Sequence, residues 1–201
     1  MTLVTYPFHY QHIRNFYSEE ELFLIWEEID RYHADGNKFL YAEDTGSAIS
    51  GGKILKGNRG VWLYDELISN SDIAKITKKL NTPKILSHPS SWFFKDVQFN
   101  CDSLLLSYYD DGDYYLRHND CSYVTACIWL YKEPKKFLGG EFHFPDYDIK
   151  IKCENNSCVI FPSNIYHSVS KVYLPEEYKN KGLGRYCISK FIMVGPDHNI
   201  F

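Results

Sequence analysis

The stretch Tyr114-Tyr115-Leu116-Arg117-His118-Asn119-Asp120 places a histidine and an aspartate two residues apart. Side chains alternate between the two faces of a β-strand, so at the end of a strand His118 and Asp120 point to the same side. A second histidine, His167, follows 49 residues after the first, and Arg185 begins an apolar segment 18 residues later. Two histidines and a carboxylate form a common ligand set for Fe(II) bound without haem. A lone His-x-Asp pair also occurs in solvated turns, so the neighbouring sequence decides its meaning.

The second half of the chain contains short β-rich segments separated by turns. Asp110-Asp111-Gly112-Asp113 and Gly139-Gly140 are the clearest turn signals. We predict eight strands from these turns and from the residue pattern between them. The predicted strands cover residues 101–109, 114–118, 124–131, 141–144, 149–152, 157–161, 167–172 and 185–194. Eight short strands at this spacing are typical of a double-stranded β-helix, also called a jelly roll.

The first half of the chain has helical patterns instead. Ser18-Glu19-Glu20-Glu21 forms a capping box and is followed by apolar residues at helical spacing, which predicts a helix over residues 19–32. A second helix is predicted over residues 72–80, after Ser71. Between them, residues 41–60 form a polar, glycine-rich stretch that indicates a long loop or a loose hairpin.

Together these patterns predict an α+β fold that is mainly β, with a jelly-roll core and the N-terminal helices packed outside it. A length of 201 residues suits one domain. We therefore expect a single domain over residues 1–201. Within it, residues 1–96 would supply helical and lid elements, and residues 97–201 would form the barrel that carries the motifs.

Composition and charge narrow the classes of partner. The net charge of −4 gives no electrostatic argument for binding nucleic acid or a membrane surface. The six cysteines show no CxxC pair and no zinc-finger spacing, so buried free thiols in a reducing cytoplasm are expected. Residues 1–10 lack the pattern of a signal peptide, and no apolar run approaches the ~20 residues of a membrane span. We expect a soluble, cytoplasmic protein, and its oligomeric state stays open.

In the order of its motifs the chain resembles the Fe(II)- and 2-oxoglutarate-dependent dioxygenases, and among them the prolyl 4-hydroxylase-like group. The resemblance covers roughly the last 100 residues. Its residues, in order, are Tyr108, Tyr115, His118-x-Asp120, Gly139-Gly140, His167 and Arg185. The resemblance implies Fe(II) as cofactor, 2-oxoglutarate and O₂ as co-substrates, and stimulation by ascorbate. It also implies hydroxylation of an unactivated C–H bond in a prolyl residue of a peptide or protein, with release of succinate and CO₂.

The resemblance also implies roles for single residues. His118, Asp120 and His167 match the iron ligands, and Arg185 matches the residue that holds the distal carboxylate of 2-oxoglutarate. A planar guanidinium suits a carboxylate because it binds in a bidentate manner. Arg185 could instead form a structural salt bridge, but an arginine on the inward face of a strand is costly to bury without an anion.

A wider set of residues is implied for the pocket. Tyr108 matches the family tyrosine whose hydroxyl bonds the co-substrate. The other candidates for the co-substrate pocket, each equally compatible with plain core packing, are Tyr115, Thr125, Trp129 and Ser189. Arg59 and Trp62, just beyond the tip of the loop at 41–60, are candidates for contacting substrate if that stretch is a lid rather than an ordinary surface loop.

The chain departs from the family pattern at two places. Trp129 stands where some relatives have a tyrosine that binds the co-substrate. The interval between His167 and Arg185 is longer than in relatives, and residues 173–184 read as an inserted polar loop. This insertion makes Lys190 a rival to Arg185, although alternation puts Lys190 on the opposite face. His143 is a rival metal ligand that is more typical of a core position.

Other classes of function stay open from the sequence. The chain could be a non-catalytic jelly-roll binding module, a hydroxylase of a free amino acid or other small molecule, or a zinc hydrolase that uses the same three ligands. Demethylation of nucleic acid is disfavoured, because relatives of that kind carry a second arginine shortly after the first and no arginine follows Arg185. The expected partner is thus a peptide, protein or small-molecule substrate, with no membrane partner.

Overall fold

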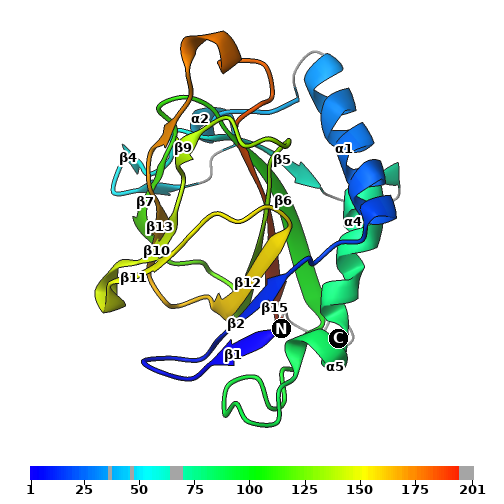
Figure 1. Cartoon of the computed structure of the whole chain (residues 1–201). Coiled ribbons are helices and arrows are strands. Elements are labelled where there is room, and N and C mark those ends of the chain that lie inside the picture. Colours follow the sequence, from blue (N-terminus) through cyan, green and yellow to red (C-terminus); the bar gives the residue numbers. More distant parts are fainter. Residues whose placement is uncertain (36–37, 46–47, 64–69, 195–201) are drawn as a thin grey trace, which may run out of the picture.

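The computed structural model describes residues 1–35, 38–45, 48–63 and 70–194. Two antiparallel β-sheets face each other, as Figure 1 shows. The larger sheet has the strand order β1 (Thr2–Val4), β2 (Tyr10–Arg14), β12 (Ser157–Pro162), β8 (Val124–Leu130), β15 (Arg185–Met193), β6 (Cys101–Tyr109) and β5 (Arg59–Leu63). The smaller sheet has the order β11 (Ile149–Ile151), β10 (Phe142–Phe144), β13 (His167–Val169) and β7 (Tyr115–His118). This is the predicted jelly-roll arrangement.

Short strand pairs, helices and 3₁₀ turns surround the two main sheets in the described part of the chain. Two strand pairs lie beside the main sheets: β3 (Ile49–Ser50) with β4 (Lys53–Ile54), and β9 (Leu138–Gly139) with β14 (Val172–Tyr173). The helices are α1 (Glu19–Ala34), α2 (Ala42–Thr45), α4 (Asp72–Thr77) and α5 (Pro83–Leu86), with 3₁₀ turns η1 (Lys78–Asn81), η2 (Pro145–Tyr147) and η3 (Glu176–Tyr178). In the part of the chain that the structure describes, no helix has the length and apolar character needed to cross a membrane.

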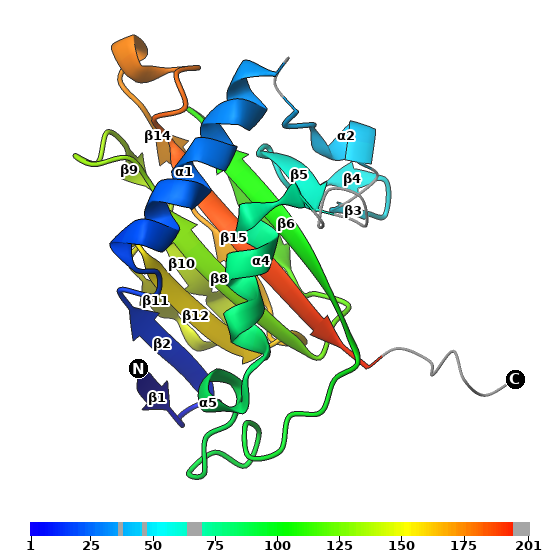
Figure 2. The same cartoon turned by 90° about the vertical axis from the view of Figure 1, so that its right-hand side faces the viewer.

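The larger sheet separates two hydrophobic clusters because successive side chains of its strands point to opposite faces. One face packs against α1 and α4, which run across it in Figure 2. Its cluster includes Leu106 of β6, Ile128 of β8 and Ile188 of β15. The other face turns toward the smaller sheet, where Trp129 of β8 packs on Phe142 of β10 with ring centroids 5.5 Å apart. The helices therefore lie outside the barrel, as predicted.

The two outer helices are joined by a buried carboxylate. Helix α1 begins at the expected capping box, in which Ser18 and Glu21 exchange hydrogen bonds. Further along α1, the Glu28 carboxylate accepts hydrogen bonds from the Ser71 hydroxyl (2.6 Å) and the Ile73 amide (2.9 Å) at the start of α4. It also accepts a hydrogen bond from the Tyr32 hydroxyl. Glu28 thus fixes the packing of α4 on α1.

The structure extends the predicted elements in the first half of the chain. The helix predicted over residues 19–32 continues to residue 34, and the one over residues 72–80 becomes α4 followed by η1. All eight predicted strands are present, with ends that shift by a few residues and with the segment 167–172 divided between β13 and β14. Strands β1, β2 and β5 were not predicted, so residues 1–96 contribute strands to the larger sheet as well as helices. The glycine-rich stretch contains the β3–β4 hairpin.

We expect Glu28→Ala to lower the free energy of unfolding by about 2–4 kcal/mol, because three buried donors lose their acceptor. Denaturant unfolding followed by circular dichroism measures this change. Glu27→Ala is the matched control, because Glu27 is an exposed residue of the same helix, and it should stay within about 0.5 kcal/mol of the parent. Equal effects of the two substitutions would contradict the assigned role of Glu28.

Candidate metal centre and co-substrate cavity

A cavity of about 630 Å³ lies between the two sheets. Its floor is β15, because alternate residues of this strand line the cavity over its whole length: Arg185, Cys187, Ser189, Phe191 and Met193. With about 3.3 Å per residue, Arg185 and Phe191 lie roughly 20 Å apart along the strand. The cavity is therefore an elongated trough with a guanidinium at one end and aromatic and aliphatic side chains at the other.

The structure brings His118, Asp120 and His167 together on the wall of this trough. His118 ends β7 and His167 begins β13, and the two residues are paired across these strands. The Nε2 atom of His118 lies 3.8 Å from Oδ1 of Asp120, and Nε2 of His167 lies 3.5 Å from Oδ2. One ligand atom from each residue lies within 4.8 Å of the others. This spacing suits one ion with ligand distances of about 2.0–2.2 Å.

The histidines are held in the form that a metal requires. Nδ1 of His118 donates to the Leu116 carbonyl (2.7 Å), and Nδ1 of His167 donates to the Ile165 carbonyl (3.0 Å), because a carbonyl can only accept. Each Nε2 atom therefore carries the lone pair and faces Asp120. Burial, together with the neighbouring His167 ring, lowers the pKa of His118 to about 4. Burial likewise lowers the pKa of His167 to about 4. Both rings are neutral at pH 7.

A cluster of hydroxyl groups orients the carboxylate of Asp120. The Thr125 hydroxyl donates to Oδ2 of Asp120 (2.7 Å) and contacts the Ser163 hydroxyl (2.9 Å). Ser163 in turn contacts the Ser122 hydroxyl at 2.7 Å, and its carbonyl accepts from the Asp120 amide at 3.0 Å. Burial raises the pKa of Asp120, and the neighbouring His118 and Thr125 oppose this shift. The aspartate is thus held at both its backbone and its side chain.

Arg185 is a buried cation that has no carboxylate partner among the described residues. Its side chain is fully buried, and Nε, Nη1 and Nη2 have no hydrogen-bond partner among the described residues. The guanidinium lies over the rings of Tyr109 (4.7 Å) and Trp129 (5.8 Å). An unpaired buried charge is costly, so this site fits a ligand that brings a carboxylate. The same cavity therefore offers a metal-ligand set and an anion site, which is the donor set that Fe(II) and 2-oxoglutarate require.

The packing of Gly140 against Arg185 explains why a glycine occupies this position in the Gly139-Gly140 turn. A Cβ atom on Gly140 would lie 2.9 Å from Cδ of Arg185, and the φ angle of Gly140 is 71°. Only glycine adopts that conformation without strain while leaving room for the arginine stem.

The structure corrects the prediction for Tyr108. Tyr108 faces the helices, and its hydroxyl donates to Asp110 at 3.0 Å. Its neighbour Tyr109 lines the cavity beside Arg185. Successive residues of a strand point to opposite faces, so a displacement of one position moves a side chain from one cluster to the other. The pairing of Tyr109 with Arg185 across β6 and β15 is the signal that would have identified it.

Other predicted residues divide between the cavity and its surroundings. Tyr115, Thr125, Ser189 and Trp62 line the cavity, and Tyr115 stacks on His118 with ring centroids 3.5 Å apart. Trp129 packs behind Arg185 rather than lining the trough.

Arg59, the predicted substrate contact, lies outside the lining of this cavity. It lies 3.5 Å from Asp110 and over the Tyr108 ring. The rival residues are also elsewhere: Lys190 pairs with Asp102 at 3.0 Å on the helix side, and His143 lies on the outer face of the smaller sheet. Three residues that were not predicted also line the cavity: Lys56, Cys127 and Cys187.

The inserted loop of residues 173–184 is anchored by the acidic turn. Asp111 accepts a hydrogen bond from the Leu174 amide (2.9 Å) and lies 3.0 Å from the Lys179 amine. Asp110 accepts from the Asn180 amide at 2.9 Å. These contacts return the chain to β15 in register, which explains how the longer interval leaves Arg185 facing the cavity.

Comparisons with known proteins agree with this geometry. Residues 104–193 match the model of the 2OG-Fe(II) oxygenase superfamily. A stretch of 91 residues is 33% identical to an uncharacterized PKHD-type hydroxylase of Synechocystis, and it covers 36% of this chain but only 30% of that protein. The segment that forms the motif-bearing part of the barrel is thus similar to the 2OG-Fe(II) oxygenase superfamily, whose members use Fe(II), 2-oxoglutarate and O₂.

Solved structures show the same fold at low identity. A Pseudomonas putida prolyl-4-hydroxylase is 15% identical, with a TM-score of 0.55 and 92% of each chain covered. A Trichoplax adhaerens prolyl hydroxylase in complex with a hypoxia inducible factor peptide fragment is also 15% identical, with a TM-score of 0.63 over 92% of this chain and 83% of that one. At these identities the likeness concerns the fold alone.

We expect Thr125→Val to weaken binding of a divalent metal about tenfold, because the Asp120 carboxylate loses the hydroxyl that orients it. Titration of the metal-free protein with Fe(II) under anaerobic conditions measures the dissociation constant. Thr125→Ser keeps the hydroxyl and is the matched control. An unchanged affinity in Thr125→Val would show that the hydroxyl does not orient the ligand.

The pair Tyr109→Phe and Tyr108→Phe tests which tyrosine contacts the co-substrate. We expect Tyr109→Phe to weaken 2-oxoglutarate binding about 3- to 10-fold, which corresponds to one hydrogen bond, and Tyr108→Phe to leave it unchanged. Equilibrium binding of 2-oxoglutarate to the iron-loaded protein without O₂ gives both values. The reverse order of effects would restore the original assignment to Tyr108.

Proposed function

We propose that this chain is an Fe(II)- and 2-oxoglutarate-dependent dioxygenase that hydroxylates a prolyl residue in a peptide or protein. The balanced reaction takes one C–H bond, O₂ and 2-oxoglutarate to one C–OH group, succinate and CO₂. The observation that carries the proposal is the unpaired, buried guanidinium of Arg185 in the same cavity as His118, Asp120 and His167. This combination distinguishes an oxygenase from a zinc hydrolase, which needs no second anion site.

Each residue has a defined task in this proposal. His118, Asp120 and His167 would hold Fe(II), and Arg185 would hold the distal carboxylate of 2-oxoglutarate with its fork of N–H donors. When bound, Fe(II) supplies the activation of O₂ that oxidation of a C–H bond requires. The two histidines donate from Nδ1 to backbone carbonyls and so keep Nε2 available as a ligand.

The remaining residues of the trough separate co-substrate from substrate. The Arg185 end is lined by Tyr109, Cys127 and Cys187, all of which are buried. At the other end, the rings of Trp62 and Phe191 lie 5.7 Å apart and form an apolar wall.

The metal-ligand set lies nearer to this apolar end. Thr125, which holds Asp120, is paired with Phe191 across β8 and β15. A wall of aromatic and aliphatic side chains suits the apolar ring of a prolyl residue. A target on the substrate side would therefore meet the metal centre from the end opposite to Arg185.

The test is the formation of succinate. Protein loaded with Fe(II) under anaerobic conditions is mixed with 2-oxoglutarate, O₂ is admitted, and succinate is measured with proline-containing peptides, with matched alanine peptides, and with free proline. We expect succinate in all samples and more of it with the proline peptides. Stimulation by free proline instead would favour the small-molecule alternative. No succinate at all, coupled or uncoupled, would leave only a binding module.

Arg185→Gln should weaken 2-oxoglutarate binding at least about 30-fold, because a buried charge partner of the carboxylate is lost. The metal-free variant should unfold at the same temperature as the parent or higher, because the substitution removes an uncompensated buried cation. Binding and thermal unfolding together separate this role from a structural one. A variant that binds 2-oxoglutarate normally would contradict the assignment of Arg185.

A further inference from the structure

A second groove runs along the outer face of the smaller sheet. Phe142 and Phe144 of β10 point into the core, so His143 between them points outward. Lys150 of β11 and Ser168 of β13 are paired with His143 and share its face. These residues line an open groove of about 720 Å³ together with residues of β7.

The groove holds two lysines, while His143 lies 3.7 Å from Asp148 and Arg117 is paired with Asp146. Lys150 and Lys171 line it, both are exposed, and neither forms an ion pair with any residue that the structure describes. Arg117 lines it as well. Glu141 is the acidic residue in the lining, and its carboxylate accepts a hydrogen bond from the Ser170 hydroxyl at 2.7 Å. Two lysines are therefore available to an anionic partner.

The groove is continuous with the candidate active-site cavity. Tyr115, Arg117 and Val169 line both. Arg117 is held at their common rim, because it donates two hydrogen bonds to Asp146 (2.9 and 2.8 Å) and stacks 3.5 Å from the ring centroid of Tyr166. A chain leaving the cavity at this rim passes directly onto the outer face of the smaller sheet.

We propose that this groove, defined by Arg117, His143, Lys150 and Lys171, binds an acidic segment of the polypeptide substrate. The inference rests on the proposed function and adds a sequence preference to it. Four strands at a spacing of about 4.8 Å span roughly 14 Å, which matches about four residues of extended peptide. The carboxylates recognised by Lys150 and Lys171 therefore lie a few residues away from the residue in the cavity.

The pattern of charges fits a peptide better than a nucleic acid. A phosphate backbone carries a charge at every nucleotide and is bound by a run of cations. Here Glu141 lies within the groove and Asp146 lies at its rim, so a continuous row of phosphates would meet carboxylates. Side-chain carboxylates spaced along a peptide can meet the lysines and avoid Glu141.

The test compares binding of labelled peptides by fluorescence anisotropy. One peptide has a proline followed by several glutamates, a second has the glutamates before the proline, and matched peptides carry glutamines instead. Binding is measured with the iron-loaded protein and 2-oxoglutarate without O₂, and again with metal-free protein. We expect one of the acidic peptides to bind about tenfold more tightly than its glutamine match, with a preference that falls as salt rises.

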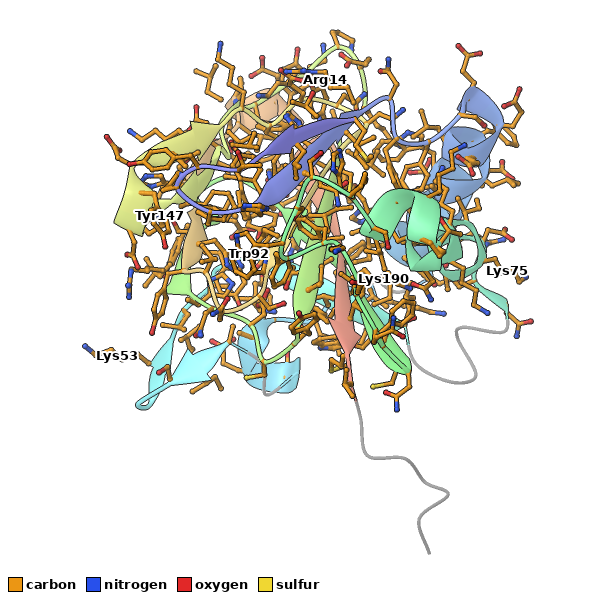
Figure 3. The ribbon with its side chains drawn as sticks, turned by 90° about the horizontal axis from the view of Figure 1, so that it is seen from below. Arg14, Lys53, Lys75, Trp92, Tyr147 and Lys190 are labelled. Atoms are coloured by element: carbon orange, nitrogen blue, oxygen red, sulfur yellow. The ribbon has the colours of Figure 1, made fainter. Side chains whose placement is uncertain are left out.

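Charge reversal locates the preference. Lys150→Glu with Lys171→Glu should abolish the tenfold preference and leave the affinity for the glutamine peptides unchanged. The matched control is Lys75→Glu with Lys84→Glu, which changes the net charge equally on exposed residues of α4 and α5. In Figure 3, Lys75 lies on the side of the molecule opposite to Tyr147 of the β10–β11 connection. The control should keep the preference.

Each outcome decides the proposal. Equal affinities for acidic and glutamine peptides, or a preference that survives the Lys150/Lys171 reversal, would overturn it. Tighter binding of a single-stranded oligonucleotide than of the acidic peptide, lost on the same reversal, would assign the groove to nucleic acid instead. Succinate formation is measured separately, so failure of the oxygenase function leaves the peptide result intact, and a missing acidic preference leaves the oxygenase function intact.

Discussion

The antiparallel pairing of β15 between β6 and β8 is the constraint on which the rest of the structure depends. The strand is held in register on both sides over most of its nine residues. Its two faces therefore have separate environments, because alternation sends every second side chain to the helices and the others to the cavity. Ile188 packs under the helices, whereas Arg185 and Ser189 reach the trough. The cavity is elongated because alternate residues of β15 line it over the whole length of the strand.

Burial determines the chemistry of the groups that reach the trough. Removing water keeps the two histidines neutral and raises the pKa of Asp120, and it leaves the Arg185 charge without a partner. Burying these groups without partners of opposite charge is energetically costly. The site therefore favours ligands that supply the opposite charge: a cation at the triad and a carboxylate at the guanidinium. The same alternation in the smaller sheet places His143 and Lys150 on its outer side, away from the core.

Much of the site could be predicted because its residues are recognised from spacing and alternation within short segments of the sequence. The His118-x-Asp120 spacing and the alternation after Arg185 each need only one strand to be understood, and the structure brings these residues together. Tyr108 was misplaced by one position because Tyr108 and Tyr109 are both aromatic, although Ser103 and Ser107 lie in phase with Tyr109 and line the cavity with it. Arg59 was misplaced because nothing local indicated that β5 pairs with β6 and directs it toward Asp110.

The sequence by itself determined the kinds of element and the set of reactive groups. Turn residues, a capping box and the order of His, Asp, His and Arg are properties of short segments, so they predict the jelly roll and the family that it resembles. Only the tertiary structure decided which tyrosine lies beside Arg185, that the Arg185 guanidinium has no hydrogen-bond partner among the described residues, and that Lys150 and His143 share an outer face. These facts depend on strand register and burial, which arise when segments distant in sequence pack together.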